Sequence, residues 1–149
     1  MKVIALNRKA LHDYTVTDTY EAGMVLEGSE VKSLRQSSVS MSDAYAEFRN
    51  GEIYVVNLHI SPYKFSSGLA PQPKRRRKLL LQKSEIRRLY GVVAQKGNAL
   101  IPLKVYFNDH GYAKLSIGVG HRKRLYDKKE KILQRESAAG LKKLRRIAR

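Results

Sequence analysis

The fold is decided by the stretch LKVYFNDHGYAKLSIGV at residues 103–119. Apolar residues alternate with polar or small residues on each side of the turn-forming residues 108–111, so two strands joined by a short turn are predicted. One face of this hairpin is expected to be apolar, and the other carries Lys104, Tyr106 and Lys114. A single apolar face indicates antiparallel strands that cover a core on one side and meet water on the other.

A second hairpin is predicted at residues 44–57, where two β-favouring runs flank Asn50-Gly51. Both central positions of a type I′ turn need a positive φ, and Asn-Gly is the pair that adopts it most readily. Residues 14–26 offer a further strand, with a bend or bulge expected at Ala22-Gly23.

Helices are fewer. Residues 83–95 predict the main helix, because apolar residues from Ile86 onward recur at helical spacing, with Ser84 as a candidate N-cap. A shorter helix is predicted at residues 30–35. Few helices among short antiparallel strands indicate a mainly β fold, and we expect a small antiparallel β-barrel of the OB-fold type. Residues 64–78, with the basic run at 74–78, are expected to lie unpacked.

Positive charge is concentrated at the C-terminal end of the 149-residue chain. Residues 120–149 hold twelve Lys or Arg and three acidic residues, a net charge of +9 out of +17 for the whole chain. Such a segment repels itself and favours a polyanionic partner, above all nucleic acid. We therefore predict a barrel at residues 1–119 and a basic tail at 120–149 that is disordered when free and helical when bound. A solvated helical appendage without a binding role is the alternative.

Enzymatic and metal-dependent functions are not indicated. The chain has no cysteine, which excludes disulfides, thiolate catalysis and thiolate metal sites, and its four histidines are not spaced as ligands. His12 beside Asp13 could act as a base with its orienting acid, but adjacent side chains on a short helix are expected to diverge. No apolar run reaches the length of a membrane span. We expect a cytoplasmic protein without catalytic residues, metal or cofactor.

Two kinds of residue leave alternatives open. Tyr45, Tyr54, Tyr106 and Tyr126 lie near basic residues or on faces expected to be wet, where their rings could stack on unpaired bases. Most tyrosines in such barrels pack at the rim, and Tyr126 is the best exception, because nothing in the tail gives it a core to join. Glu30 is either a surface acid in the first turn of a helix or a carboxylate that accepts hydrogen bonds from an exposed base edge. From the residues alone, the first interpretation of Glu30 is favoured.

A set of short motifs gives a more specific indication through its order and spacing. The motifs are Asn7-Arg8-Lys9-Ala10 with His12-Asp13-Tyr14, Tyr20-Glu21-Ala22-Gly23, the segment from Gly28 to Arg35, Asp43-Ala44-Tyr45, His59-Ile60-Ser61-Pro62, Arg77-Lys78-Leu79-Leu80-Leu81, Pro102-Leu103 with Tyr106, Gly118, and Tyr126-Asp127-Lys128. Together they resemble the SsrA-binding protein family, also called small protein B, which partners transfer-messenger RNA (tmRNA) in bacterial trans-translation. The resemblance runs from about residue 7 to residue 131.

The resemblance implies an OB-type barrel without enzymatic activity that binds the tRNA-like domain of tmRNA and helps deliver it to stalled ribosomes. The tail would enter the small subunit's decoding centre and the empty mRNA channel. Elongation factor Tu would be a further partner in the delivery complex, and the protein would act as a monomer on the RNA. The implied RNA-binding residues are Asn7, Arg8, Lys9, Glu30, Lys32, Arg35, Lys104, Tyr106 and Lys114, and the implied ribosome-binding residues of the tail are Lys123, Tyr126, Asp127, Lys128 and Lys129.

The chain departs from the family pattern at three places. Leu11 stands where the family has a basic residue, and Lys129 replaces an arginine and its bidentate fork. Arg122 occupies a position that is commonly glycine, which makes Gly120 the expected hinge of the tail. Two other functions stay open on the residues alone: an architectural protein that coats nucleic acid through charge, and an enzyme that acts on RNA.

Overall fold

The computed structural model describes residues 1–65, 68 and 71–123. In these residues, nine strands and three helices follow one another along the chain. They are β1 (Lys2–Leu6), α1 (Arg8–Asp13), β2 (Tyr14–Met24), α2 (Gly28–Arg35), β3 (Val39–Ser40), β4 (Tyr45–Arg49), β5 (Glu52–Val56), β6 (His59–Ile60), β7 (Arg77–Leu80), α3 (Lys83–Val93), β8 (Asn98–Phe107) and β9 (Ala113–Arg122).

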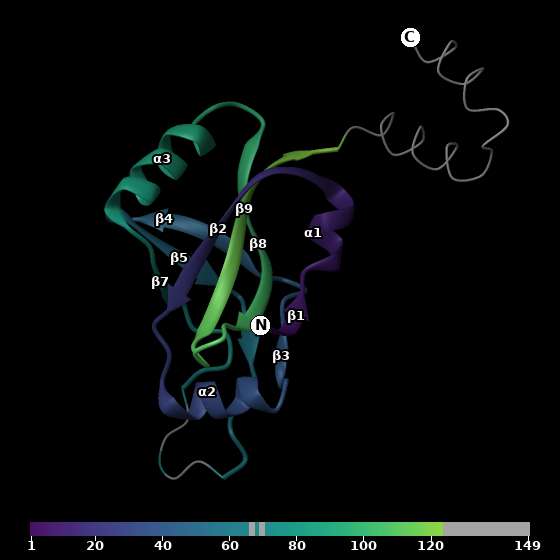
Figure 1. The fold of residues 1–149 in the computed structure, drawn as a ribbon, viewed down its shortest axis with the longest axis vertical. Helices are drawn as coiled ribbons and strands as arrows, with labels where there is room; N and C mark the ends of the chain where they lie inside the picture. The colour runs from purple at the N-terminus through teal and green to yellow at the C-terminus, as the bar shows by residue number, and fades with distance from the viewer. Residues whose placement is uncertain (66–67, 69–70, 124–149) are drawn as a thin grey trace, which may run out of the picture.

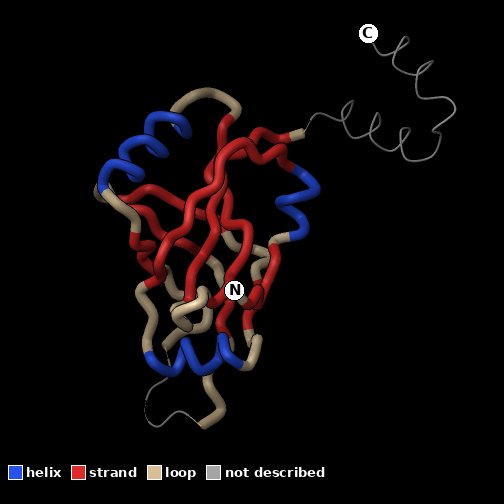
Figure 2. The backbone as a smooth tube through the Cα atoms, viewed as in Figure 1, coloured by secondary structure: helices blue, strands red, loops and turns tan. Residues whose placement is uncertain are grey.

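Seven of the strands form one sheet in the order β1-β8-β9-β2-β7-β5-β4, and β3 pairs with β6. Every pairing is antiparallel. The sheet curls on itself, since β4 at one end lies beside β8 near the other. Figure 1 shows α3 and α2 at opposite ends of this curled sheet, with α1 along one side. Strands dominate the backbone (Figure 2), so the predicted mainly β fold with few helices is confirmed.

Each predicted hairpin is present. β4 and β5 meet at Asn50 and Gly51, whose φ angles are 52° and 76°, as a type I′ turn requires. β8 and β9 pair from Asn98 with His121 to Phe107 with Ala113, so this hairpin is longer than the sequence pattern indicates.

The single apolar face predicted for the β8–β9 hairpin is wrong. The pairing of β8 with β9 shifts register between Pro102 and Lys104, which marks a bulge. As a result, Val105 lies in the main core, whereas Leu103 joins a second small core with Ala10 of α1. Strict alternation could not reveal this, because the bulge changes which face a side chain occupies and α1 covers the face expected to be wet.

β2 also contains a bulge, at a different place from the one predicted. Its pairing with β9 shifts register between Val16 and Asp18, not at Ala22-Gly23. Gly23 instead marks a close approach, since a Cβ atom there would lie 3.3 Å from the Cβ of Leu80. The glycine therefore permits tight packing between β2 and β7.

The predicted main helix is confirmed as α3, which buries Ile86 and Leu89 against the core. Its N-cap is Gln82 and not Ser84, because the backbone N–H of Gln82 donates to the Glu85 carboxylate at 3.1 Å. The shorter predicted helix is α2, which begins two residues earlier than expected. β1 was not predicted, and α1 was assumed only as the short helix that holds His12 and Asp13.

Two expectations about unpacked chain are wrong. The segment at residues 64–78 is not wholly loose, because it leads into β7, where Arg77 is fully buried. Gly120 is not a hinge, because it pairs with Val16 and Ala99 within β9, and a Cβ atom there would lie 2.6 Å from Ile101 Cδ1. Strand β9 continues to Arg122, so the boundary expected after residue 119 falls inside a strand.

Candidate nucleic-acid interface

The outer face of β2, β8 and β9 brings together several of the predicted RNA-binding residues. Tyr106 of β8 lies opposite Lys114 of β9, and Lys104 lies two residues before Tyr106 on the same strand. The Nζ atom of Lys104 lies 5.3 Å from the centre of the Tyr106 ring, a cation–π contact. The hairpin therefore presents two lysines around one tyrosine, as the sequence predicted.

Tyr106 is not an open stacking platform. The residue is only 5% exposed, and its hydroxyl donates a hydrogen bond to the carboxylate of Glu21 on β2. Burial and this hydrogen bond raise the pKa of Tyr106 well above its ordinary value. The hydroxyl therefore stays protonated and anchors β8 to β2. Glu21 was missed as a candidate, because nothing local in the sequence reveals its cross-strand partner.

A groove of about 460 Å³ extends this surface from the strands to α2. It is lined by Lys114 at the start of β9, Arg35 at the end of α2, and Leu80 at the end of β7. Leu80 and the neighbouring Tyr112 are 53% and 68% exposed, so apolar and aromatic surface lies between the two cations. This combination suits a ligand with phosphates and unpaired bases. Neither Leu80 nor Tyr112 was predicted.

The start of α1 adjoins the same strands. Leu6 pairs with Lys104, and Asn7 then donates through Nδ2 to the carbonyl oxygen of Pro102 at 2.8 Å. Asn7 is also the N-cap of α1, since its side chain accepts a hydrogen bond from the N–H of Ala10. Asn7 is thus buried and structural, whereas Arg8 and Lys9 are exposed on the first turn of the helix.

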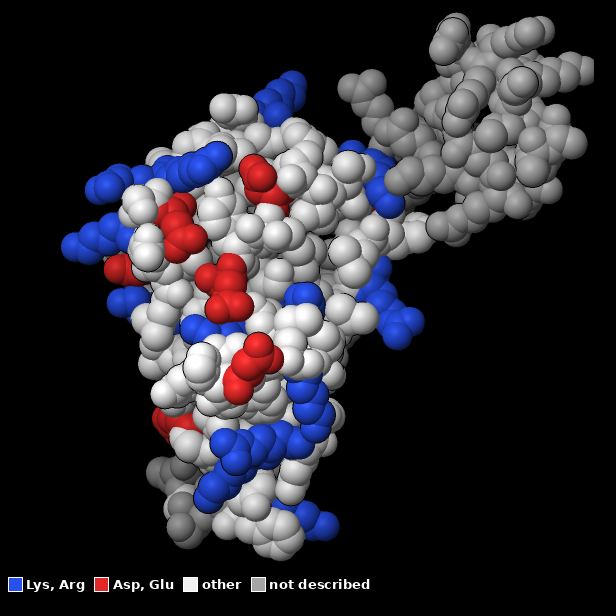
Figure 3. Space-filling view, in the orientation of Figure 1, with Lys and Arg blue, Asp and Glu red and all other residues white. Residues whose placement is uncertain are grey.

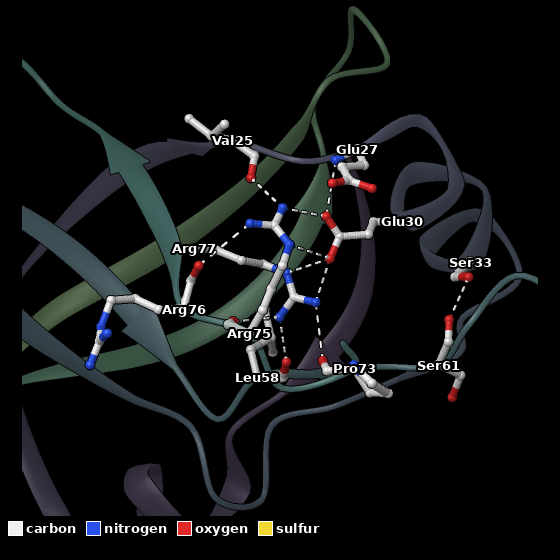
Figure 4. Close-up of polar contacts among 10 residues, drawn as sticks. All are labelled: Val25, Glu27, Glu30, Ser33, Leu58, Ser61, Pro73, Arg75, Arg76 and Arg77. Carbon is white, nitrogen blue, oxygen red and sulfur yellow. Dashed lines mark hydrogen bonds and ion pairs between the residues drawn. The ribbon is translucent and has the colours of Figure 1, made fainter. Parts of the chain in front are cut away.

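Glu30 lies inside the protein, only 2% exposed, at the centre of a buried ionic network (Figure 4). Oε1 accepts from the backbone N–H of Glu27 at 2.9 Å and from Arg75 at 2.5 Å. Oε2 accepts from Arg75 at 3.2 Å and from Arg77 at 2.8 and 2.5 Å. Burial acts to raise the pKa of Glu30, but the hydrogen bonds from Arg75, Glu27 and Arg77 outweigh it, so the pKa is lowered.

Arg77 uses all five of its N–H donors in this network. Besides the two bonds to Glu30, it donates to the carbonyl oxygens of Leu58 at 2.6 Å, Arg75 at 3.2 Å and Pro73 at 3.0 Å. A guanidinium so saturated by the protein has nothing left to offer a phosphate. The basic run at residues 74–78 is therefore partly a structural element. Glu30 was predicted to contact an exposed base edge. It is instead buried, and its carboxylate holds Arg75 and Arg77 inside the fold.

Lys32 and Arg35 project from α2, the helix that this network holds in place. Neither makes an ion pair with any acidic residue in the described part of the chain, and the same is true of Arg8, Lys9 and Lys114. Lys32 lies 5.5 Å from the centre of the Tyr63 ring. Figure 3 shows Lys and Arg side chains over α2 and beside α1, with acidic side chains between them. These cations have their charge available to an external anion.

The remaining predicted residues belong to the tail. Lys123 is the last described residue, and its backbone N–H donates to the carbonyl oxygen of Asp13 at 2.7 Å. Tyr126, Asp127, Lys128 and Lys129 lie outside the described residues. The ribosome-binding part of the prediction therefore stays a prediction.

The described residues contain few features of a catalytic or metal-binding site. His12 and Asp13 do not diverge as expected, because Nδ1 lies 3.1 Å from Oδ1, although the His12 side chain is largely exposed. Residues 1–65, 68 and 71–123 contain no group of three or more His, Cys, Asp or Glu placed to hold a metal ion. Within these ranges, no helix is long and apolar enough to cross a membrane.

Comparison with known proteins decides the family. A family model described as SmpB protein matches residues 4–147. The chain belongs to the SmpB family. The SsrA-binding protein of Pseudothermotoga lettingae is 52% identical over 136 residues, which cover 91% of each chain. The SsrA-binding protein of Thermus thermophilus is 50% identical over 129 residues, 87% of this chain and 90% of the relative.

A solved structure agrees with the family assignment. This structure, "tmRNA-SmpB: a journey to the center of the bacterial ribosome", matches with a TM-score of 0.68 at 49% sequence identity. The match covers 89% of this chain and 95% of the other. The resemblance inferred from the motifs is thus confirmed, and the curled sheet of this SmpB family member is similar to that of the solved structure.

Proposed function

We propose that this protein is an RNA-binding adaptor that binds the tRNA-like domain of tmRNA and delivers it to stalled ribosomes. Membership of the SmpB family carries this proposal, since its relatives are named for binding SsrA and the solved neighbour is a tmRNA–SmpB complex on the ribosome. The protein acts without catalysis, in the cytoplasm where ribosomes work. Elongation factor Tu is its further partner during delivery.

The RNA surface that we propose is the outer face of β8 and β9 together with the groove that reaches α2. Lys104 and Lys114 contact phosphates from the strands, and Arg35 and Lys32 contact them from the helix. Leu80 and Tyr112 fill the space between these cations with apolar surface. A folded RNA that presents phosphates and unstacked bases at a bend fits this arrangement better than a straight duplex.

The test is a competition gel shift with the full chain, using the tRNA-like domain of tmRNA and a DNA duplex of equal length at rising salt concentrations. The adaptor keeps a preference for the tRNA-like domain at high salt, whereas a protein that only coats nucleic acid loses both ligands alike. Arg35→Gln with Lys114→Gln should weaken binding of the tRNA-like domain by about tenfold or more and lower the salt slope by roughly 0.7–0.9 per contact.

The matched control is Lys96→Gln, which removes one charge from an exposed loop outside this surface. It should leave the salt slope unchanged. Equal competition by DNA and the tRNA-like domain, or an unchanged affinity in the Arg35 and Lys114 double variant, would contradict the proposed surface.

A further inference from the structure

A second groove lies between α3 and the turn that joins β4 to β5, away from the residues of the proposed surface. Phe48 and Arg49 line it from the end of β4, and Ile86, Arg87 and Tyr90 line it from α3. Its volume is about 520 Å³. None of these residues belongs to the RNA-binding set predicted from the sequence, so the family resemblance does not account for the groove.

Two aromatic rings form the apolar part of this groove. The rings of Phe48 and Tyr90 meet edge to face, with their centres 5.4 Å apart and their planes at 89°. This contact fixes the position of Tyr90, yet 63% of the tyrosine remains exposed. A tyrosine that is held in place but not covered can receive another flat ring.

The groove has two walls. Tyr90 of α3 lies on one of them. The opposite wall is the type I′ turn, in which Asn50 and Gly51 are held at positive φ angles. A two-residue turn of this type matches the twist of its flanking strands, so it sets where the end of β4 lies beside α3.

The charges at the groove are positive and available. The guanidinium groups of Arg49 and Arg87 form no ion pair or hydrogen bond within the described residues, and Lys83 lies one helical turn before Arg87. The acidic residues closest in strand register already have partners. Glu52, opposite Arg49, lies 3.7 Å from the Nζ of Lys78, and Glu47 lies 2.6 Å from Arg76.

We propose that this groove binds one unpaired nucleotide of an RNA strand, with the base against Tyr90 and the flanking phosphates bound by Arg49 and Arg87. A nucleotide offers both the flat ring and the negative charge that the groove lacks. A base paired within a duplex is stacked on each side and cannot reach the ring, so the ligand is single-stranded. An acidic peptide would satisfy the arginines but would leave the aromatic surface without a flat partner.

The experiment uses the full chain and a short single-stranded oligoribonucleotide with 4-thiouridine at its centre. After irradiation, mass spectrometry of the digested protein identifies the peptides that carry the crosslinked nucleotide. The peptide that contains Tyr90 should carry an adduct. Tyr90→Ala should lower the affinity for the oligonucleotide by about tenfold, the usual effect of removing a stacking ring, and Tyr90→Phe should restore it.

Matched variants separate this site from general attraction to a basic protein. Arg49→Gln with Arg87→Gln should remove most of the adduct at the Tyr90 peptide, whereas Arg88→Gln, on the same helix but outside the groove, should leave it unchanged. The proposal is overturned if adducts form only on peptides outside the groove, if the double arginine variant keeps the full adduct, or if a glutamate-rich peptide displaces the oligonucleotide at equal concentration. The readout does not depend on tmRNA, so it stands apart from the proposed function.

Discussion

Arg77 and Glu30, which are 47 residues apart in the sequence, are joined by two hydrogen bonds to one carboxylate oxygen, at 2.8 and 2.5 Å. Arg77 belongs to β7 and Glu30 to the first turn of α2. The pair therefore fixes the helix that carries Lys32 and Arg35 to the sheet that carries Lys104 and Lys114. The geometry of the proposed RNA surface depends on two residues that do not themselves face the solvent.

Replacing Arg77 should lower the free energy of unfolding. Arg77→Met leaves the buried Glu30 with one arginine fewer and removes the donors to the carbonyl oxygens of Leu58 and Pro73. Breaking a buried ion pair from one side typically costs about 3–5 kcal/mol of unfolding free energy. Because Arg75 still contacts Glu30, we expect about 3 kcal/mol, measured by urea denaturation.

The neighbouring residue provides the control for this variant. Arg76 is 40% exposed in its side chain and pairs with Glu47 at the surface. Arg76→Met removes the same charge, but a surface ion pair contributes only about 0–1 kcal/mol. Equal losses of stability in the two variants would show that charge alone, and not the buried network, accounts for the effect.

The buried carboxylate also predicts how stability depends on pH. The pKa of Glu30 in the folded protein lies below its ordinary value of 4.5, so the unfolded chain takes up the proton at a higher pH than the folded one. The contribution of Glu30 is therefore fully present above about pH 4.5 and is lost as the pH falls through the folded pKa. We expect the stability difference between the wild type and Glu30→Gln to be constant from pH 6 to pH 7 and to shrink toward pH 3, as measured by urea denaturation across about that range.

The other carboxylates of the chain titrate in both proteins, so the difference between them isolates Glu30. A difference that stayed constant down to about pH 3 would mean that Glu30 titrates alike in the folded and unfolded chain. That outcome would contradict the depressed pKa and the ionic network assigned to this residue.

The sequence predicted the features that are encoded locally. Asn50-Gly51 specifies its own turn, and the helical repeat from Ile86 specifies α3, because each depends on residues that are close in the chain. Arg77 was not predicted as buried, because a run of basic residues indicates a solvated surface and its partner Glu30 lies far away in sequence. The same reason hid the pairing of Tyr106 with Glu21, 85 residues apart.

The candidate site, like the fold, was predicted only in part. The motifs indicated the family, and the alternation of residues placed Lys104, Tyr106 and Lys114 on one hairpin, which the strand register confirms. They could not indicate that Glu30 and Asn7 are buried, because a motif records which residues occur and not which way they face. The groove from Lys114 to Arg35 is lined by residues from four separate segments. No single segment contains a sequence pattern that could have predicted the groove.

Gly120 should not tolerate a side chain. A Cβ atom at this position would lie 2.6 Å from Ile101 Cδ1 and 3.3 Å from the carbonyl oxygen of Thr15, so the Ile101 side chain would have to leave its place and the Thr15 backbone would have to shift slightly. Gly120→Ala is expected to lose about 1–3 kcal/mol of unfolding free energy, the usual cost of overpacking. Thermal denaturation followed by circular dichroism would measure the loss.

At Gly91, in contrast, an alanine should increase the stability of the protein. It lies within α3, where a Cβ atom meets nothing within 4 Å, so Gly91→Ala should gain up to about 1 kcal/mol through helix propensity. A Gly120→Ala variant as stable as the wild type would show that Ile101 and Thr15 make room at little cost, and a destabilised Gly91→Ala variant would show that space beside α3 is less open than the structure indicates.

Removing residues 126–149 should separate RNA binding from ribosome rescue. The cations of the proposed RNA surface all lie at or before Lys114, so the truncated protein should bind the tRNA-like domain within about tenfold of the full chain, a difference of about 1.4 kcal/mol. Rescue of stalled ribosomes in a reconstituted translation system should be lost, because all the proposed ribosome-binding residues except Lys123 lie in the segment removed. The full chain with Lys128→Gln and Lys129→Gln tests the same idea without truncation and should reduce rescue while leaving RNA binding intact. If truncation instead abolished binding of the tRNA-like domain, the principal RNA contacts would have to lie in the tail, and the division of labour between the strands and the tail would be wrong.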